Sequence, residues 1–160
     1  MKNRQLFHEY AKEILENEFF LKNKKFISHG AISMYSHCVA VAALSFSMAE
    51  DDSTIDKKCL VRAALLHDFF LYECHAMGPR YLVHGWIHAG IAAEKAREIF
   101  NVSDKEYSCI RTHMWPWTLF HPPLCREGWI ITAADKIVAL YETIFGRSRK
   151  HPLAVKSESC

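Results

Sequence analysis

Along most of this chain, apolar residues recur three and four positions apart, which is the spacing of a helix that packs one face against a core. The first such run contains Leu6, Phe7, Tyr10, Ile14 and Leu15. The same pattern predicts a second helix from about Ser33 to Met48 and a third over residues 55–70, with Ser53 or Thr54 as its N-cap. The N-terminal half is therefore expected to form three helices.

A turn signal divides the middle of the chain. Gly78–Pro79 excludes a continuous helix and predicts a loop over residues 74–85. The apolar pattern then resumes and predicts a helix from His88 to Phe100. Loops carried by a rigid helical framework often contribute to function.

Two further helices are predicted in the C-terminal third. Ser103 and Glu106 have the spacing of a capping box, which begins a helix toward His113. A loop rich in proline and aromatic residues follows over residues 114–125. The last helix carries an apolar stripe that we expect to face the core, made of Trp129, Ile130, Ala133, Ile137, Leu140, Tyr141 and Ile144. Gly146 is its expected C-cap.

No segment has the pattern of a strand, because β-branched residues are few and never alternate with polar ones over a strand's length. The expected fold is all-α, a single-domain helical bundle of about six or more helices over residues 1–146. A polar tail over residues 147–160 follows it. A chain of 160 residues with 50% hydrophobic composition suits one core.

Composition and charge narrow the possible partners. The formal net charge is only +2 and the basic residues are scattered, so nothing indicates a nucleic-acid surface, although a nucleotide-sized substrate fits. No apolar stretch is long enough for a secretory signal or for a membrane span. The six cysteines form no CxxC pair, which favours reduced thiols in a cytoplasmic protein without a membrane partner. The oligomeric state is left open.

The candidate chemistry lies in histidines and aspartates that stand beside apolar residues on different predicted helices. These residues are His37, His67, Asp68, His88, His113 and Asp135. The doublet His67–Asp68 comes directly after the apolar run AALL, so a well-anchored helix end presents an imidazole beside a carboxylate. A mixed site of this kind suits Fe, Mn or Zn. Asp135 interrupts an apolar stripe and would be costly to bury unless it were paired or bound to a metal.

This ordered set resembles the HD superfamily of metal-dependent phosphohydrolases, in which a His, an HD doublet and a distal Asp bind one metal. The match runs from roughly Phe26 to Thr143. Members with a two-metal site have two further histidines between the doublet and the last Asp, and His88 and His113 occupy those places here. The stretches FISHGAISMYSH and HGWIHAG look like small bacterial HD proteins.

The resemblance implies a centre of two divalent ions, Fe or Mn in the first place, with Zn, Ni, Co or Mg as alternatives. Asp68 is the implied bridge, and it is also the expected catalytic residue that orients the attacking water or accepts its proton. Two ions about 3.5 to 4 Å apart can hold a phosphoryl group and activate a shared water as the nucleophile. The expected substrate is a small phosphorylated molecule such as a nucleotide.

The chain departs from the superfamily pattern just after the doublet, where a Lys that contacts phosphate often stands. Here residues 69–73 read FFLYE. The residues that could contact the phosphate charge instead are therefore Lys136, Arg80, His29 and His84. Directly after a candidate ligand, Trp115 could form a wall for a flat group.

Several alternatives stay open at this point. His37 could be a helix histidine satisfied by a backbone carbonyl, and Asp135 could pair with Lys136, although adjacent helical residues do not face each other. His88 and His113 could contact substrate in a one-metal site, and His84 competes with His88. The functional alternatives are a di-iron oxygenase acting on a small hydroxylated substrate and a non-catalytic binding module stabilised by metal.

Overall fold

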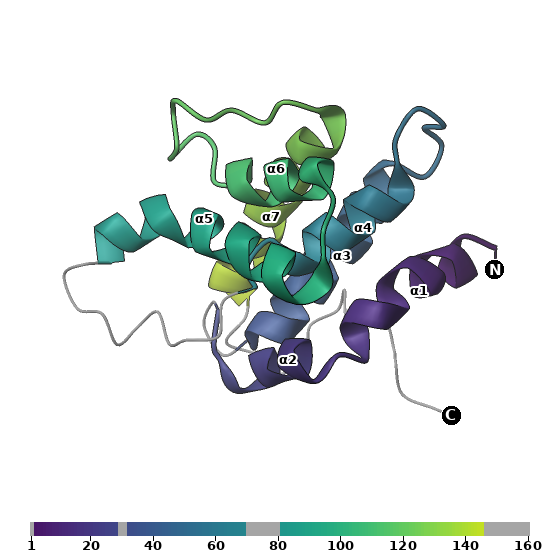
Figure 1. The fold of residues 1–160 in the computed structure, drawn as a ribbon, viewed down its shortest axis with the longest axis horizontal. Coiled ribbons are helices and arrows are strands. Elements are labelled where there is room, and N and C mark those ends of the chain that lie inside the picture. Colours follow the sequence, from purple (N-terminus) through teal and green to yellow (C-terminus); the bar gives the residue numbers. More distant parts are fainter. Residues whose placement is uncertain (1, 29–31, 70–80, 146–160) are drawn as a thin grey trace.

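The computed structural model describes residues 2–28, 32–69 and 81–145, with side chains described for residues 3–28, 32–69 and 87–145. Its helices are α1 Lys2–Leu15, α2 Glu18–Leu21, the 3-10 helix η1 Lys22–Lys25, α3 Met34–Met48, α4 Lys57–Leu66, α5 Tyr81–Phe100, α6 Asp104–Thr112 and α7 Arg126–Phe145. No strand occurs in these three ranges, where the single isolated bridge joins Ile27 to Ser33. The predicted all-α fold is confirmed (Figure 1).

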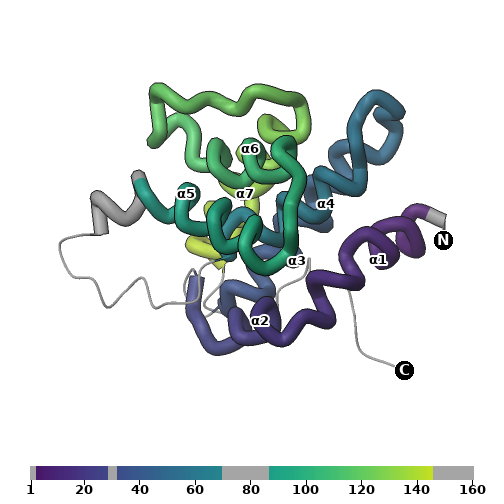
Figure 2. The backbone as a smooth tube through the Cα atoms, in the orientation of Figure 1, coloured from purple at the N-terminus to yellow at the C-terminus, as the bar shows by residue number. Residues whose placement is uncertain are grey.

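The core forms where α3, α4, α6 and α7 meet. Helix α3 packs on α4 and α7, α6 packs on α4, α5 and α7, and α1 covers the outer side of α4 (Figure 2). Leu60 and Leu65 of α4, Ile110 of α6 and Ile131 of α7 are fully buried. Each such side chain contributes about 1.5–3 kcal/mol through burial. The hydrophobic core therefore lies between helices that also carry residues of the candidate site.

Helix starts follow the local capping residues. Ser33 Oγ accepts from Ser36 N at 3.2 Å, and the predicted capping box of Ser103 with Glu106 is present. The third helix, however, is not capped by Ser53 or Thr54. Asp56 caps it by accepting from Cys59 N at 3.0 Å, since a carboxylate one residue before the helix competes better than hydroxyls farther back.

The expected helix beginning at His88 begins earlier, at Tyr81. Gly85, which we had interpreted as part of a loop, lies inside α5. A single glycine costs a helix only about 1 kcal/mol, and the strong helix-forming residues after it outweigh that cost. The loop prediction was based on Gly78 and Pro79, and both lie outside the described residues.

Helix α7 presents a different face to the core from the one predicted. Ile131, Ala134 and Val138 are fully buried, and the polar Asp135 and Glu142 are buried on the same side of the helix. Five members of the predicted stripe are exposed instead, namely Trp129, Ala133, Ile137, Leu140 and Ile144. The prediction was wrong because α7 carries apolar residues around most of its circumference, so their positions alone do not select the buried side.

The side chain of Arg62 joins α4 to α1, α5 and α6. Arg62 of α4 is 7% exposed and donates to Glu106 Oε1 at 2.8 Å, to Glu13 Oε2 at 2.6 Å and to Phe100 O at 3.1 Å. Arg62→Ala leaves the buried Glu106 carboxylate without its charged partner, so we expect a loss of about 3–5 kcal/mol in the free energy of unfolding, measured with urea. Lys95→Ala, which removes an exposed pair with Glu98, is the control, with an expected loss under about 1 kcal/mol. Equal losses in the two variants would contradict the structural role of Arg62.

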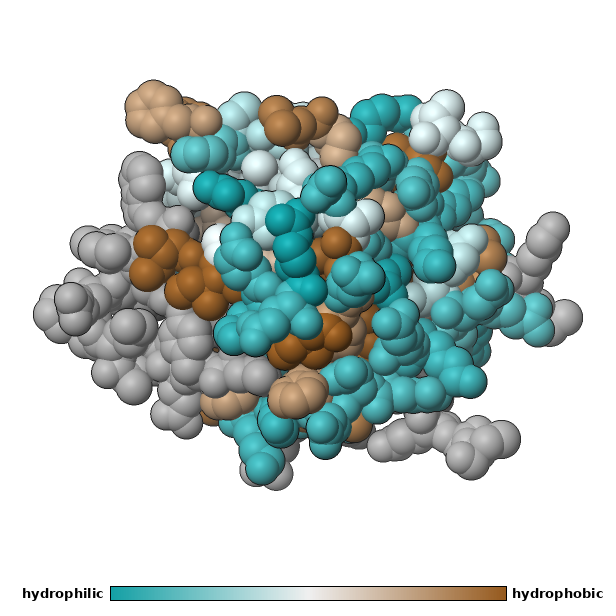
Figure 3. Space-filling model, in the orientation of Figure 1, coloured by the Kyte–Doolittle hydropathy of each residue, from teal (hydrophilic) through white to brown (hydrophobic). Residues whose placement is uncertain are grey.

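No helix of the described chain is both long enough and apolar enough to cross a membrane. The visible face of the molecule is mostly hydrophilic, with a hydrophobic patch over α5 (Figure 3).

Candidate metal centre

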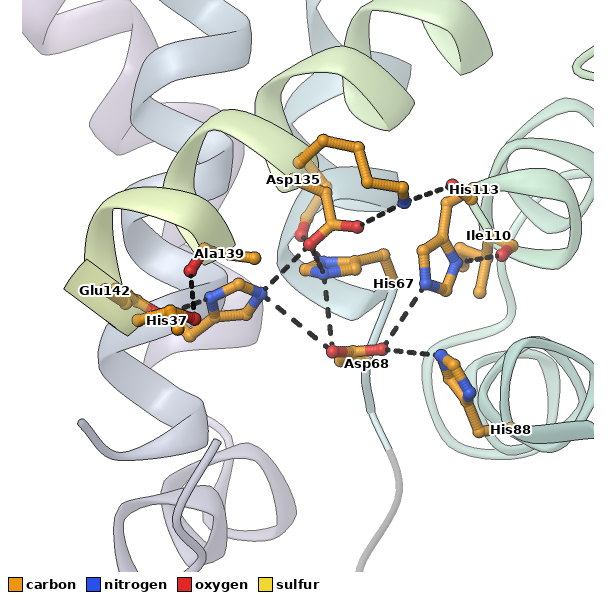
Figure 4. Close-up of polar contacts among 12 residues, drawn as sticks. His37, His67, Asp68, His88, Ile110, His113, Asp135, Ala139 and Glu142 are labelled. Atoms are coloured by element: carbon orange, nitrogen blue, oxygen red, sulfur yellow. Dashed lines mark hydrogen bonds and ion pairs between the residues drawn. The ribbon is translucent and has the colours of Figure 1, made fainter. Parts of the chain in front are cut away.

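The six candidate ligands, which lie far apart in the sequence, converge at one place in the bundle (Figure 4). They are His37 of α3, His67 and Asp68 directly after α4, His88 of α5, His113 at the end of α6 and Asp135 of α7. The histidine side chains are at most 10% exposed and the two carboxylates at most 14%. The structure therefore brings together every residue of the set that the sequence singled out.

The first group of ligand atoms gathers around the Nε2 atom of His67. That atom lies 3.6 Å from Asp68 Oδ2 and 3.6 Å from Asp135 Oδ1. His37 Nε2 completes the group at 3.2 Å from Asp135 Oδ1 and 3.9 Å from Asp68 Oδ2. Two imidazoles and two carboxylates thus face a common point.

The second group gathers around the other oxygen of Asp68. His88 Nε2 and His113 Nε2 each lie 3.4 Å from Asp68 Oδ1. Asp68 is therefore shared, with one oxygen turned toward each group.

The distances within each group suit coordination to an ion. Ligand atoms about 2.0–2.2 Å from one ion lie about 3.0–3.5 Å from one another in tetrahedral or octahedral geometry. The buried His67 Nε2 makes no hydrogen bond to the described residues, although it faces two carboxylates. The residues present therefore fit a divalent metal with mixed nitrogen and oxygen ligands.

Hydrogen bonds at Nδ1, the ring nitrogen opposite Nε2, orient the imidazoles of His67 and His113. His67 Nδ1 lies 2.8 Å from Ala64 O, and His113 Nδ1 lies 2.7 Å from Ile110 O. Since a carbonyl only accepts, each Nδ1 carries the proton and each Nε2 presents its lone pair to the centre. Both rings therefore have the tautomer that a metal ligand needs.

His37 is oriented by a carboxylate that the sequence analysis did not identify. Its Nδ1 lies 2.8 Å from Glu142 Oε2, and both side chains are fully buried. Glu142 follows Asp135 by seven residues, which places the two on one face of α7. That spacing from a candidate ligand was the available signal.

The charges around the centre favour a cation. Although burial raises the pKa values of Asp68 and Asp135, the neighbouring histidines hold both well below the ordinary range. Burial lowers the pKa of His37, but its hydrogen bonds to Asp135 and Glu142 outweigh burial and carry the pKa up to about 10. The site thus holds ionised carboxylates that require positive charge nearby.

The proposed substrate contacts are only partly within the described residues. Lys136 Nζ lies 2.9 Å from Asp135 Oδ2 and 3.2 Å from His113 O, so the contact between adjacent helical residues that we had discounted does form. The side chain of Lys136 is long enough to bend back to Asp135, although adjacent residues of a helix point in different directions. Trp115 is half-buried and packs edge-on against Trp129, with ring centroids 4.9 Å apart.

The remaining candidates cannot be placed at the centre. His29 and Arg80 lie outside the described residues. His84 belongs to α5, but its side chain is not among those described.

The position after the doublet is part of the core. Phe69 is fully buried and contacts Phe100 at 5.2 Å and Phe20 at 6.4 Å between ring centroids. A lysine cannot replace it there without burying a charge.

A surface pocket of about 450 Å³ lies beside the centre rather than on it. Residues of α5 line it together with Arg111 of α6 and with Thr118 and His121. None of the six candidate ligands contributes to its wall, so this pocket is separate from the candidate centre.

Comparison with known proteins agrees with this geometry. A family model described as the HD domain matches residues 34–140, a span that contains all six candidate ligands. No curated protein and no solved structure gives a significant match to the chain.

Proposed function

Since the chain belongs to the HD-domain family, whose members are mostly metal-dependent hydrolases, we propose that it cleaves a phosphoester or phosphoanhydride bond at a two-cation centre. The proposed substrate is a nucleotide or a similar small phosphorylated metabolite. The observation that carries the proposal is the position of Asp68, whose two carboxylate oxygens face two different groups of ligands.

Each residue of the centre has a proposed task. His37, His67 and Asp135 would hold one cation, His88 and His113 the other, and Asp68 both. Two divalent cations, when bound, lower the pKa of a shared water and offset the charge of a phosphoryl group. Asp68 would also orient the attacking water or accept its proton. Iron or manganese suits the ligand set best, with zinc, nickel, cobalt and magnesium as alternatives.

Lys136 is the described cation best placed to contact phosphate. Its side chain is 35% exposed, and its ammonium lies against Asp135 at the edge of the centre. An ammonium has three donors, and two are used by Asp135 and the carbonyl of His113. The third would donate to a phosphoryl oxygen, the task that a Lys after the doublet performs elsewhere in the family.

The test measures the metal content by elemental mass spectrometry, after aerobic and anaerobic purification, together with phosphate release from a panel of nucleotides. About two Fe or Mn per chain with phosphate release would support the proposal. One metal per chain would instead make His88 and His113 substrate contacts. Lack of any turnover would favour a binding module stabilised by metal.

A di-iron oxygenase is the second candidate function. The observation that favours it is the lack of a Lys directly after the doublet, where Phe69 is buried against Phe100 instead. Two irons per chain, oxygen uptake with small polyols or phosphonates, and no phosphate release would establish this alternative.

His113→Ala tests whether the two groups bind separately. The variant removes one imidazole beside Asp68 Oδ1 and leaves His37, His67 and Asp135 in place. We expect the metal content to fall from about two ions per chain to about one, measured by elemental mass spectrometry. His121→Ala, outside both groups, serves as the control and should keep the full content. Loss of all metal in His113→Ala would show that the two groups do not bind independently.

A further inference from the structure

Three cysteines gather in the bundle away from the candidate metal centre. Cys109 of α6 has its Sγ 3.4 Å from Sγ of Cys125, which lies directly before α7. The thiol of Cys59, on α4, is near enough to Cys109 to raise the pKa of Cys109. The proposed hydrolase chemistry uses none of these thiols. The cluster has no signature in the sequence, because its members are 16 or more residues apart and form no CxxC pair.

The two nearest thiols differ in access to solvent. Cys109 is 1% exposed, whereas Cys125 is only partly buried. Cys125 belongs to the irregular segment that precedes α7, so its sulfur can shift without unwinding a helix. A Cβ on Gly128 would lie 3.0 Å from Pro123 Cβ and 3.8 Å from each sulfur, so the glycine lets α7 begin close against the pair.

We propose that Cys109 and Cys125 are a redox modification site that closes reversibly into a disulfide on reaction with a hydroperoxide. The step requires the sulfurs to approach from 3.4 Å to the bonded distance of about 2.05 Å. Cys59 is close enough to act as a third thiol but belongs to a helix interior, so it is not the preferred partner.

The chemistry proceeds in two displacements. The Cys125 thiolate attacks one peroxide oxygen, the S–O bond forms, the O–O bond breaks, and the departing oxygen takes up a proton as water or alcohol. Cys109 sulfur then attacks Cys125 sulfur, the S–S bond forms, and hydroxide leaves with the Cys109 proton as a second water. The two thiols together lose two electrons and two protons, which reduce the peroxide.

The order of these displacements follows from the surroundings of Cys109. The neighbouring Cys59 thiol and burial raise the pKa of Cys109, so this thiol is a poor first nucleophile. Cys125 must therefore react first, and the short distance to Cys109 then favours closure.

The modification lies on the same helices as the candidate ligands. Cys109 precedes His113 by four residues, about 6 Å along α6. Closing the pair would join α6 to the start of α7, the helix that carries Asp135. The disulfide would thus link two helices that hold ligands of the two different groups.

The test treats the full chain, with Cys74→Ser and Cys160→Ser to simplify the mapping, with hydrogen peroxide and then an alkylating reagent. Peptide mass spectrometry should show a peptide pair joined through Cys109 and Cys125, about 2 Da lighter than the sum of its reduced parts and released by dithiothreitol. Cys59→Ser should keep this crosslink and Cys125→Ser should abolish it. Cys109→Ser should instead leave a sulfenic acid on Cys125 that dimedone captures.

A comparison with unfolded protein separates the folded geometry from general thiol reactivity. The crosslink should form at least about tenfold faster in the folded chain than in urea, because folding holds the two sulfurs together. Equal rates, a crosslink from Cys59 to Cys109 instead, or complete alkylation of both cysteines after peroxide treatment would each overturn the proposal. Circular dichroism of every variant confirms that it is folded during the test.

Discussion

Asp68→Ala is expected to lose both metal binding and turnover. The change removes the only carboxylate among the described residues that both groups of ligands share, because Oδ2 faces His67 and Oδ1 faces His88 and His113. Without it the second group retains two imidazoles and no carboxylate. Metal content by elemental mass spectrometry and phosphate release measure the two effects, and activity should fall to background.

Asp68→Asn tests the sharing itself. An amide has one carbonyl oxygen, so it can serve one group of ligands but not both. We expect this variant to retain about one ion per chain while Asp68→Ala retains fewer. Asp104→Asn, at a fully exposed position, is the matched control and should behave as the unchanged chain. Full metal content in Asp68→Ala, with a normal circular dichroism spectrum, would rule out the bridge.

Glu142→Gln is expected to weaken metal binding by about 10- to 100-fold. The amide oxygen can still accept from His37 Nδ1, but it lacks the negative charge that makes the imidazole a stronger donor to a cation. The hydrogen bond of Glu142 is to the ring atom of His37 opposite the ligand atom Nε2 (Figure 4), so Glu142 acts through His37 as a positioning residue. Competition with a chelator measures the affinity.

The control for this prediction is Glu98→Gln, a change at an exposed carboxylate of α5. Urea unfolding of metal-free protein reports any damage to the fold separately from metal affinity. If Glu142→Gln bound metal as tightly as Glu98→Gln, the hydrogen bond would orient His37 without strengthening it. If only the unfolding free energy changed, Glu142 would have a purely structural role.

The convergence of the candidate ligands was predictable because each stands at a place where sequence and fold agree. His67 and Asp68 follow an apolar run that fixes the end of α4, and His113 ends a helix whose capping box marks its start. A buried polar residue between apolar neighbours, such as Asp135, requires a partner wherever the helix packs. The helical class followed from the same periodicity.

The buried face of α7 was not predictable from that periodicity. Amphipathic patterns assign apolar side chains to the core, but the inner face of α7 carries Asp135 and Glu142, while Ile137 and Leu140 face outward. The polar residues lie inside because they contact the imidazoles of other helices. These contacts between helices therefore reverse the amphipathic pattern locally, and for the same reason the pattern does not identify Glu142.

The predicted N-cap of α4 was wrong for a more local reason. Asp56 was overlooked as the cap of α4 because Ser53 and Thr54 are also good capping residues, and only the folded geometry selects among them.

Helices α4 and α6 both end at the centre, with His67 and His113 as their C-caps. Each helix end adds about half a negative charge to the carboxylates, which helps to retain cations. With two divalent ions bound, and with Lys136 and Glu142 included, the centre would keep a net charge of roughly +1. An excess of this sign attracts an anionic substrate but also retains the phosphate that hydrolysis releases. Departure of the product would then limit turnover, and inorganic phosphate would compete with the substrate.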